Sequence, residues 1–145
     1  MSASGHKRPE SVLVVVHTSD RLCLMLERTQ PRGFWQSVTG SLRWKETAAD
    51  AAAREVREET GLDPVDLVDA RDERRFVIAP EWRHRYAADV NENIEHWFYL
   101  ELPGVCEVTL SPAEHCRYEW LDLDAAIERA TSWTNREAIE ALRSP

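Results

Sequence analysis

The chain of 145 residues is 43% hydrophobic, a composition that suits one domain with an ordinary core. Its 26 acidic residues outnumber its 18 basic residues and give a net charge of −8. Because proteins that bind nucleic acid usually carry a basic surface, this balance argues against nucleic acid as a partner.

The first part of the chain predicts a series of strands. Val12–His17 is a continuous, Val-rich apolar run, which is typical of a buried strand. A turn signal follows at Ser19–Arg21, and further strands are predicted at Leu22–Leu26 and Phe34–Thr39. The glycine-led segment Gly40–Glu46 is predicted to be a loop.

The segment Ala48–Thr60 strongly favours an α-helix, because it consists mainly of alanine, glutamate and arginine. Thr47 can cap its first turn, and Asp50 three residues later is a weak capping-box partner. Gly61 stands where a left-handed C-terminal cap belongs, and Pro64 prevents continuation of the helix. The sequence therefore predicts both ends of this helix.

The second half predicts more strands and two shorter helices. The predicted strands are Val65–Asp69, Arg74–Ile78, His96–Glu101 and Arg117–Leu121. A helix is expected over Asp124–Ala130, and a last helix is expected to begin at a capping box in Thr134–Glu137 and to end at Arg143. Mixed strands with few helices predict one α/β sheet with helices packed on it.

The three cysteines, Cys23, Cys106 and Cys116, are widely spaced and odd in number, so they predict neither a disulfide framework nor a zinc site. Free thiols fit a reducing compartment. The sequence has no apolar signal segment and no apolar run that could span a bilayer. We therefore expect a cytoplasmic protein without a membrane partner.

Three glutamates gather on one side of the central helix. On a helical wheel, Glu55, Glu58 and Glu59 fall within an arc of about 100°. A small apolar arc lies beside them and is expected to pack on the sheet; it consists of Ala49, Ala52, Ala53 and Val56. Such a cluster repels itself unless a cation binds, and carboxylates are ligands that Mg²⁺ prefers. Three glutamates alone, however, are more often a solvated helix face.

The spacing of the glutamates relative to other residues makes the metal hypothesis specific. The sequence reads Gly40-x5-Glu46-x7-Arg54-Glu55-Val56-x-Glu58-Glu59-x-Gly61-Leu62. The seven glycine, glutamate and arginine positions of this pattern, at ordinary usage, would match by chance at on the order of 10⁻⁸ per starting residue. A solvated face does not explain such a match.

This pattern is the complete Nudix box, and the chain resembles the Nudix hydrolases, which cleave a phosphoanhydride bond in a nucleoside diphosphate linked to another group. The resemblance implies a single domain over residues 1–145, with the box at 40–62. It also implies an α/β/α sandwich with a mixed β-sheet and a strand-loop-helix-loop catalytic motif. The expected cofactor is Mg²⁺, for which Mn²⁺ can substitute.

The resemblance also implies a set of metal ligands. Glu55 and Glu59 correspond to the principal ligands, Glu58 is a third candidate, and the carbonyl of Gly40 corresponds to a backbone ligand. A further acidic residue often joins from outside the box, and Glu114 is the candidate; the alternative is an ordinary loop glutamate. The catalytic base varies within the family and stays unassigned.

Two other residues of the box are expected to hold the site in place. Arg54 lies one turn before Glu58 and can pair with it, and it completes the catalytic set with Glu55, Glu58 and Glu59. Glu46 is expected to brace the preceding loop against the helix.

Segments outside the box resemble a branch of the family that removes pyrophosphate from a pterin triphosphate in folate biosynthesis. The segments are Lys7–Pro9, Phe34–Gly40, Arg83–Ala87, Glu95–Phe98 and Ser132–Arg136. The stretch Asp63–Trp82 matches this branch least well.

A flat ring and a triphosphate need different contacts. Lys7 and Arg28 are expected to contact phosphates, Thr39 can donate its hydroxyl, and Ser132 is a further candidate contact. The residues expected to cover the ring are Phe76, Val77, Ile78 and Ala79. Arg28 could instead be a solvent-exposed residue at the end of a strand, and Phe76 could be a core residue.

Three more features have two interpretations. The cluster Arg83–Arg85 is either a polyphosphate contact or a solvated loop. The indoles of Trp35, Trp97 and Trp120 are expected in the core or on a sheet face. The partner is expected to be a small-molecule pterin or nucleoside triphosphate, and the protein a monomer or homodimer.

Two rival functions stay open. The same chemistry could act on canonical or oxidised nucleoside triphosphates, or the fold could bind a nucleotide without cleaving it. The retained carboxylates argue against loss of catalysis.

Overall fold

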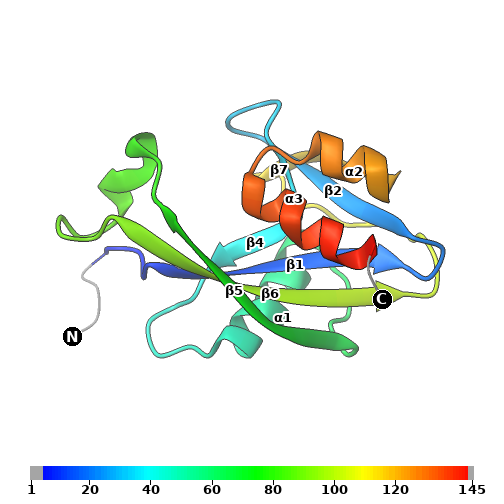
Figure 1. The fold of residues 1–145 in the computed structure, drawn as a ribbon, viewed down its shortest axis with the longest axis horizontal. Helices are drawn as coiled ribbons and strands as arrows, with labels where there is room; N and C mark the ends of the chain where they lie inside the picture. The colour runs from blue at the N-terminus through cyan, green and yellow to red at the C-terminus, as the bar shows by residue number, and fades with distance from the viewer. Residues whose placement is uncertain (1–4, 144–145) are drawn as a thin grey trace.

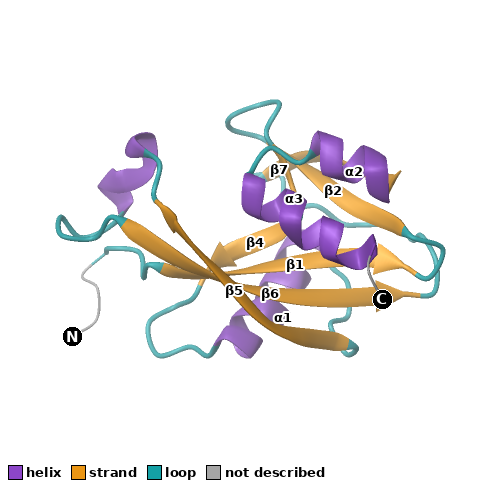
Figure 2. Ribbon diagram, in the orientation of Figure 1, coloured by secondary structure: helices purple, strands orange, loops and turns teal. Residues whose placement is uncertain are grey.

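A mixed β-sheet through the centre of the molecule carries three α-helices on its two faces (Figures 1 and 2). The computed structural model describes residues 5–143. The strands are β1 (Glu10–Thr18), β2 (Leu22–Arg28), β3 (Trp35–Gln36), β4 (Val38–Ser41), β5 (Leu67–Val77), β6 (Glu92–Leu102) and β7 (His115–Asp122). The helices are α1 (Ala48–Thr60), α2 (Leu123–Arg129) and α3 (Trp133–Glu140), with 3₁₀ turns η1 (Pro80–Arg85) and η2 (Ala141–Arg143).

The central strand β1 organises the sheet. It runs parallel to β6 along its whole length, whereas β4 and β2 pair antiparallel with successive parts of its other edge. The full order is β3-β2-β1-β6-β5, with β4 on β1 and β7 on β2. The sheet is therefore mixed, as predicted.

Alternate residues of β1 point to opposite faces and build two cores. Val12 and Val14 pack with Ala52 and Val56 of α1 on one face. Leu13 and Val15 pack on the other face, where α2 and α3 contribute Ala126, Ala138 and Ile139. The predicted α/β/α sandwich is confirmed.

Helix α1 has the predicted ends. The Thr47 side chain accepts a hydrogen bond from the Asp50 N–H, and Gly61 caps the last turn with φ 72°. Its buried face differs from the prediction, because Ala51 is fully buried whereas Ala49 is exposed. Ala53 is only half-buried, so the apolar arc is rotated toward the glutamates.

Two strand predictions need correction. Val65–Asp69 and Arg74–Ile78 are not separate strands but one strand, β5, whose register against β6 shifts between Asp69 and Glu73. The predicted strand Phe34–Thr39 is divided into β3 and β4 at Ser37. The Ser37 N–H donates to the side chain of Asn135 (2.8 Å), which replaces a sheet hydrogen bond there.

The last helix begins two residues earlier than its predicted capping box. Ser132 is the N-cap, and its hydroxyl accepts a hydrogen bond from the Asn135 N–H (3.2 Å). The Thr134–Glu137 box is therefore wrong, because Thr134 already lies in the first turn and is buried. The α-helix ends at Glu140, and η2 continues the chain to Arg143.

Trp35 and Trp97 are buried, as predicted, and Trp120 is half-buried against the α1-side core. Cys23 is buried, whereas Cys106 and Cys116 are exposed and all three thiols are free. Within residues 5–143, no helix combines the length and apolarity that a bilayer crossing requires.

Candidate active site

A pocket of about 960 Å³ is lined by Thr39, Gly40 and Ser41 of the short strand β4 and by residues of α1 and α3, which lie on opposite faces of the sheet. Every predicted substrate contact lines it: Lys7, Arg28, Thr39, Phe76, Val77, Ile78, Ala79 and Ser132. Four of the five predicted metal ligands line it too: Gly40, Glu55, Glu59 and Glu114. Segments distant in sequence therefore meet in one cavity, whereas Glu58 and Arg54 are not part of its wall.

The two carboxylates at the α1 side of the pocket are buried. Glu59 is 1% exposed and Glu55 is 8% exposed, and Glu59 Oε1 accepts no hydrogen bond among the described residues. Burial raises the pKa of Glu59 well above its usual range, and the neighbouring Glu55 and Glu114 raise it further. The pKa of Glu55 is also raised, mainly by burial. A cation between them would offset both effects.

Gly40 makes close approach to this pair possible. A Cβ atom at Gly40 would collide with the carboxylate and Cγ of Glu55. Only glycine therefore allows the β4 backbone to lie against the Glu55 side chain.

Arg54 anchors the loop before α1. Its guanidinium donates two hydrogen bonds to Glu46, from Nε (2.9 Å) and Nη2 (2.8 Å), and a third to Glu55 (3.0 Å). The predicted contact with Glu58 exists but is the longest, at 3.4 Å. The Arg54–Glu46 pair lowers the pKa of Glu46 to about 2. The expected brace between loop and helix is therefore present, and within α1 Arg54 lies closer to Glu55 than to Glu58.

Glu58 is much more exposed than the buried pair. Its side chain is 50% exposed and lies 3.5 Å from Arg43. A half-exposed carboxylate with two arginine neighbours is already solvated and paired, which weakens the case for it as a third metal ligand.

A histidine that the sequence analysis did not single out lies beside the carboxylates. Candidate ligand atoms of Glu59, Glu114 and His115 lie within 4.8 Å of one another. His115 Nε2 lies 3.0 Å from the Gln36 amide nitrogen, and its Nδ1 faces Glu59 at 3.9 Å. Burial, with a smaller contribution from Arg28, lowers the pKa of His115 to about 4. The ring is therefore neutral at pH 7, and no spacing signal in the sequence linked it to the box.

Three cations line the same pocket. Burial lowers the pKa of Lys7, as do the nearby Arg85 and Arg28. The Arg28 guanidinium carbon lies 5.2 Å from the centre of the Trp82 ring and 5.7 Å from that of Phe34. An anionic ligand would relieve the mutual repulsion of these cations.

The residues of the cluster Arg83–Arg85 line two different depressions. Arg85 lines the large pocket, whereas Arg83 and His84 line a separate, more open depression. Only Arg85 is therefore placed to contact a ligand of the main pocket.

Two predicted contacts are already engaged within the protein. The Thr39 hydroxyl donates to the Val12 carbonyl (2.9 Å), so its proton is not free for a phosphate, contrary to the expectation. The Ser132 hydroxyl accepts from the Asn135 N–H. In the predicted ring wall, Ile78 is 3% exposed, Phe76 is half-buried and Val77 is largely exposed.

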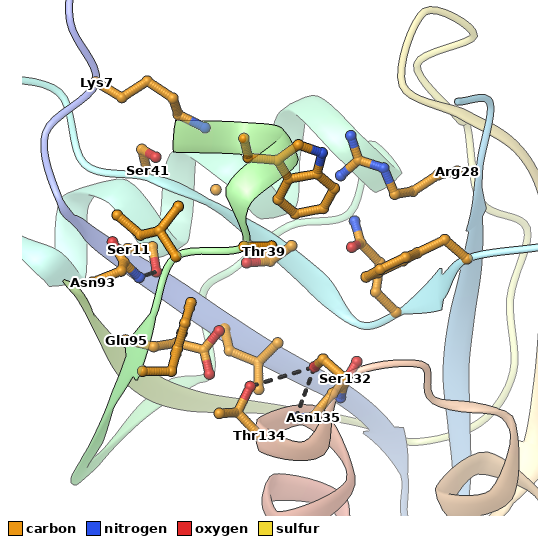
Figure 3. A pocket seen from close by; sticks show the side chains of 18 of the residues that line it. Lys7, Ser11, Arg28, Thr39, Ser41, Asn93, Glu95, Ser132, Thr134 and Asn135 are labelled. Carbon is orange, nitrogen blue, oxygen red and sulfur yellow. Dashed lines mark hydrogen bonds between the residues drawn. The ribbon is translucent and has the colours of Figure 1, made fainter. Parts of the chain in front are cut away.

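On the α3 side, the pocket has polar walls that the sequence analysis missed: Ser11, Asn93, Glu95, Thr134 and Asn135. Figure 3 shows Glu95, Thr134 and Ser132 on one side of the cavity, with Lys7 and Arg28 across it. The strand segment containing Glu95 was part of the family resemblance, but no local signal showed which way that side chain points.

The fold and this site define the class of protein. The family described as NUDIX domain matches residues 7–142, and the chain belongs to this family. It is 46% identical to the dihydroneopterin triphosphate diphosphatase of Escherichia coli K12, over 97% of this chain and 95% of that protein. The enzyme of the same name from Haemophilus influenzae is 38% identical, over 93% of this chain and 87% of the relative.

A solved structure agrees with these similarities. The E. coli dihydroneopterin triphosphate pyrophosphohydrolase superposes with a TM-score of 0.88 at 45% identity, covering 94% of this chain and 95% of that one. The predicted family and fold are thereby confirmed.

Proposed function

We propose that this chain hydrolyses 7,8-dihydroneopterin 3′-triphosphate to dihydroneopterin monophosphate and pyrophosphate, a step of folate biosynthesis. One observation carries the proposal: a single pocket joins buried carboxylates, three cations and a partly apolar wall. The same reaction is named in the two relatives and the solved structure described above.

A divalent cation is part of this proposal, with Mg²⁺ as the cofactor and Mn²⁺ as a substitute. Glu55, Glu59 and Glu114 would hold it, together with the Gly40 carbonyl. The unpartnered Glu59 Oε1 and the buried pair of acids fit such an ion, because hard cations bind carboxylate oxygens. When bound, the cation neutralises phosphate charge and activates water for attack.

The residues of the chain supply binding and orientation. Lys7, Arg28 and Arg85 bind phosphate oxygens on the side facing the carboxylates. Arg54 fixes Glu55 through its Nη1 contact, while Glu46 holds the Arg54 guanidinium from its other edge. Phe76–Ala79 cover one side of the ring.

The charge distribution also fits a small anionic substrate. The protein carries a net charge of −8, yet Lys7, Arg28 and Arg85 meet in the pocket. With a divalent cation held by the carboxylates, these three groups would attract a triphosphate into the pocket even though the molecule as a whole is acidic. The cytoplasmic location, the single-domain extent and the monomeric or homodimeric state stay predictions.

A substrate panel tests the proposal. Pyrophosphate release is measured with Mg²⁺ for the pterin triphosphate and for the canonical and oxidised deoxynucleoside triphosphates. We expect the pterin substrate to have the highest kcat/KM. Faster turnover of several deoxynucleoside triphosphates would assign the enzyme to nucleotide sanitation instead.

A further inference from the structure

The α3 side of the pocket ends on a cluster of buried polar side chains. Asn93 and Glu95 come from β6, Ser11 comes from the adjacent β1, and Thr134 comes from the first turn of α3. Asn93 is 3% exposed and Glu95 is 5% exposed, yet both line the cavity (Figure 3). Because they are two residues apart on one strand, their side chains lie on the same face, about 7 Å apart along the strand.

The hydrogen bonds within this cluster leave acceptors unfilled. The Asn93 amide donates to the Ser11 hydroxyl (2.8 Å), while the Asn93 Oδ1 atom has no partner among the described residues. The Trp97 indole N–H donates to Glu95 Oε1 (3.2 Å). The Thr134 side chain also hydrogen-bonds Glu95. These contacts still leave lone pairs on the oxygens of Asn93 and Glu95, so this wall of the pocket can accept hydrogen bonds from a ligand.

Within residues 5–143, no lysine, arginine or histidine forms an ion pair with Glu95. Arg74 pairs opposite Glu95 in the sheet, but its guanidinium binds Glu137 (2.9 Å) and Asp72 (2.8 Å). The same guanidinium lies 4.1 Å from the centre of the Trp97 ring. Burial raises the pKa of Glu95, against the lowering effect of the Thr134 and Trp97 hydrogen bonds. A buried carboxylate with spare acceptor capacity is costly unless a ligand supplies donors.

The chemistry of the required ligand follows from these acceptors. A 2-amino-4-oxopyrimidine ring presents an N–H and an amino group side by side, and the two donors match the two oxygens of a carboxylate. Guanine presents the same edge, whereas adenine and cytosine place an acceptor beside their amino group and uracil flanks its N–H with two carbonyls. Only the first type of edge meets a carboxylate with two parallel hydrogen bonds.

We propose that Glu95 selects the substrate by binding the N3–H and 2-amino group of a 2-amino-4-oxopyrimidine ring, with the Asn93 carbonyl as a further acceptor. This inference rests on the proposed function, because the phosphate contacts across the pocket direct the ring toward Glu95. It extends that function by assigning recognition of the ring to residues of β6, which are different from the residues that contact phosphate.

Two commercial ring compounds test the assignment without phosphate, metal or turnover. Pterin carries the 2-amino group, whereas lumazine carries a carbonyl at the same position of the same bicyclic ring. Their dissociation constants are measured by titrating their fluorescence with the wild-type protein, Glu95→Gln and Glu92→Gln. Glu92 is an exposed glutamate on the same strand outside the pocket, so its variant is the matched control.

We expect the wild-type protein and Glu92→Gln to bind pterin roughly tenfold or more tightly than lumazine, because lumazine places an oxygen against the Glu95 carboxylate. In Glu95→Gln the ratio should fall to about one, since the amide replaces one acceptor with a donor. A merely structural role for Glu95 would weaken both ligands alike and leave the ratio unchanged.

A wild-type ratio near one, no detectable binding of pterin, or an unchanged ratio in Glu95→Gln would overturn the inference. The wild-type ratio needs no variant, so a folding defect in Glu95→Gln leaves the test intact. Failure of the proposed hydrolysis would appear in the substrate panel, whereas the pterin-to-lumazine ratio would be unaffected by it.

Discussion

At the scale of single residues, Glu59 occupies an unusual position. It is a fully buried carboxylate beside a second buried carboxylate, and one of its oxygens has no hydrogen-bond partner within residues 5–143. Such an arrangement destabilises the protein by itself, and the proposed cation would offset that cost. The sequence pattern identified Glu59 as a ligand candidate, but its depth could not be predicted from helix periodicity.

Replacing Glu59 with Gln should lower Mg²⁺-dependent kcat by more than roughly 100-fold, since even residues that only support metal ligands cost 10–100-fold. The melting temperature without metal should be unchanged or higher, because one of two adjacent buried acids becomes neutral. Steady-state kinetics and thermal unfolding measure both effects. Glu140→Gln, an exposed site on α3, serves as the control, and full activity of Glu59→Gln would refute the metal assignment.

A methyl group at Gly40 gives a second residue-scale prediction. Gly40→Ala forces the Glu55 carboxylate to move, which should cost about 1–3 kcal/mol of stability and most of the activity. Chemical denaturation and the pyrophosphate assay measure the two losses. Gly104→Ala, where nothing lies within 4 Å, is the matched control and should behave as wild type.

At the scale of elements, the sequence predicted α1 closely because its ends depend on local signals. Thr47 and Gly61 act within one turn of the helix, so no tertiary information is needed. Which face of α1 is buried depends instead on how the helix packs on the sheet. The prediction buried Ala49 and Ala53, whereas the structure buries Ala51, Glu55 and Glu59. The polar wall on β6 was missed for the same reason, because strand alternation does not show which face carries a pocket.

The loop before α1 gives a pH prediction. The pKa of Glu46 is about 2 in the folded protein and 4.5 in its ordinary state, so its pairing with Arg54 stabilises the fold above pH 4.5. That contribution is lost as pH falls from about 4.5 to about 2. The melting temperature of the wild-type protein should therefore fall further across this pH window than that of Glu46→Gln. Parallel curves of melting temperature against pH would contradict the pairing.

The start of α3 tests the corrected helix cap. Ser132→Ala removes the side-chain acceptor for the Asn135 N–H and should cost about 1 kcal/mol. Ser132→Asp restores an acceptor and should recover most of the loss. Urea denaturation measures both variants, and equal stability of wild type and Ser132→Ala would place the cap elsewhere.

At the scale of the whole molecule, the two parts of the proposed site lie on opposite faces of the sheet. The α1 side supplies Glu55 and Glu59, while the α3 side supplies Glu95, and the pocket connects them around β4. The box could be found from the sequence because its residues are contiguous. His115 and Glu95 reach the pocket only through the pairing of β7 with β2 and of β6 with β1, which no local pattern reveals.

The most direct measurement is a crystal structure with Mg²⁺ and a non-hydrolysable analogue of dihydroneopterin triphosphate. We expect the cation at Glu55 and Glu59, phosphates against Lys7 and Arg28, and the pterin edge on Glu95. A cation bound elsewhere, with these carboxylates free, would contradict it.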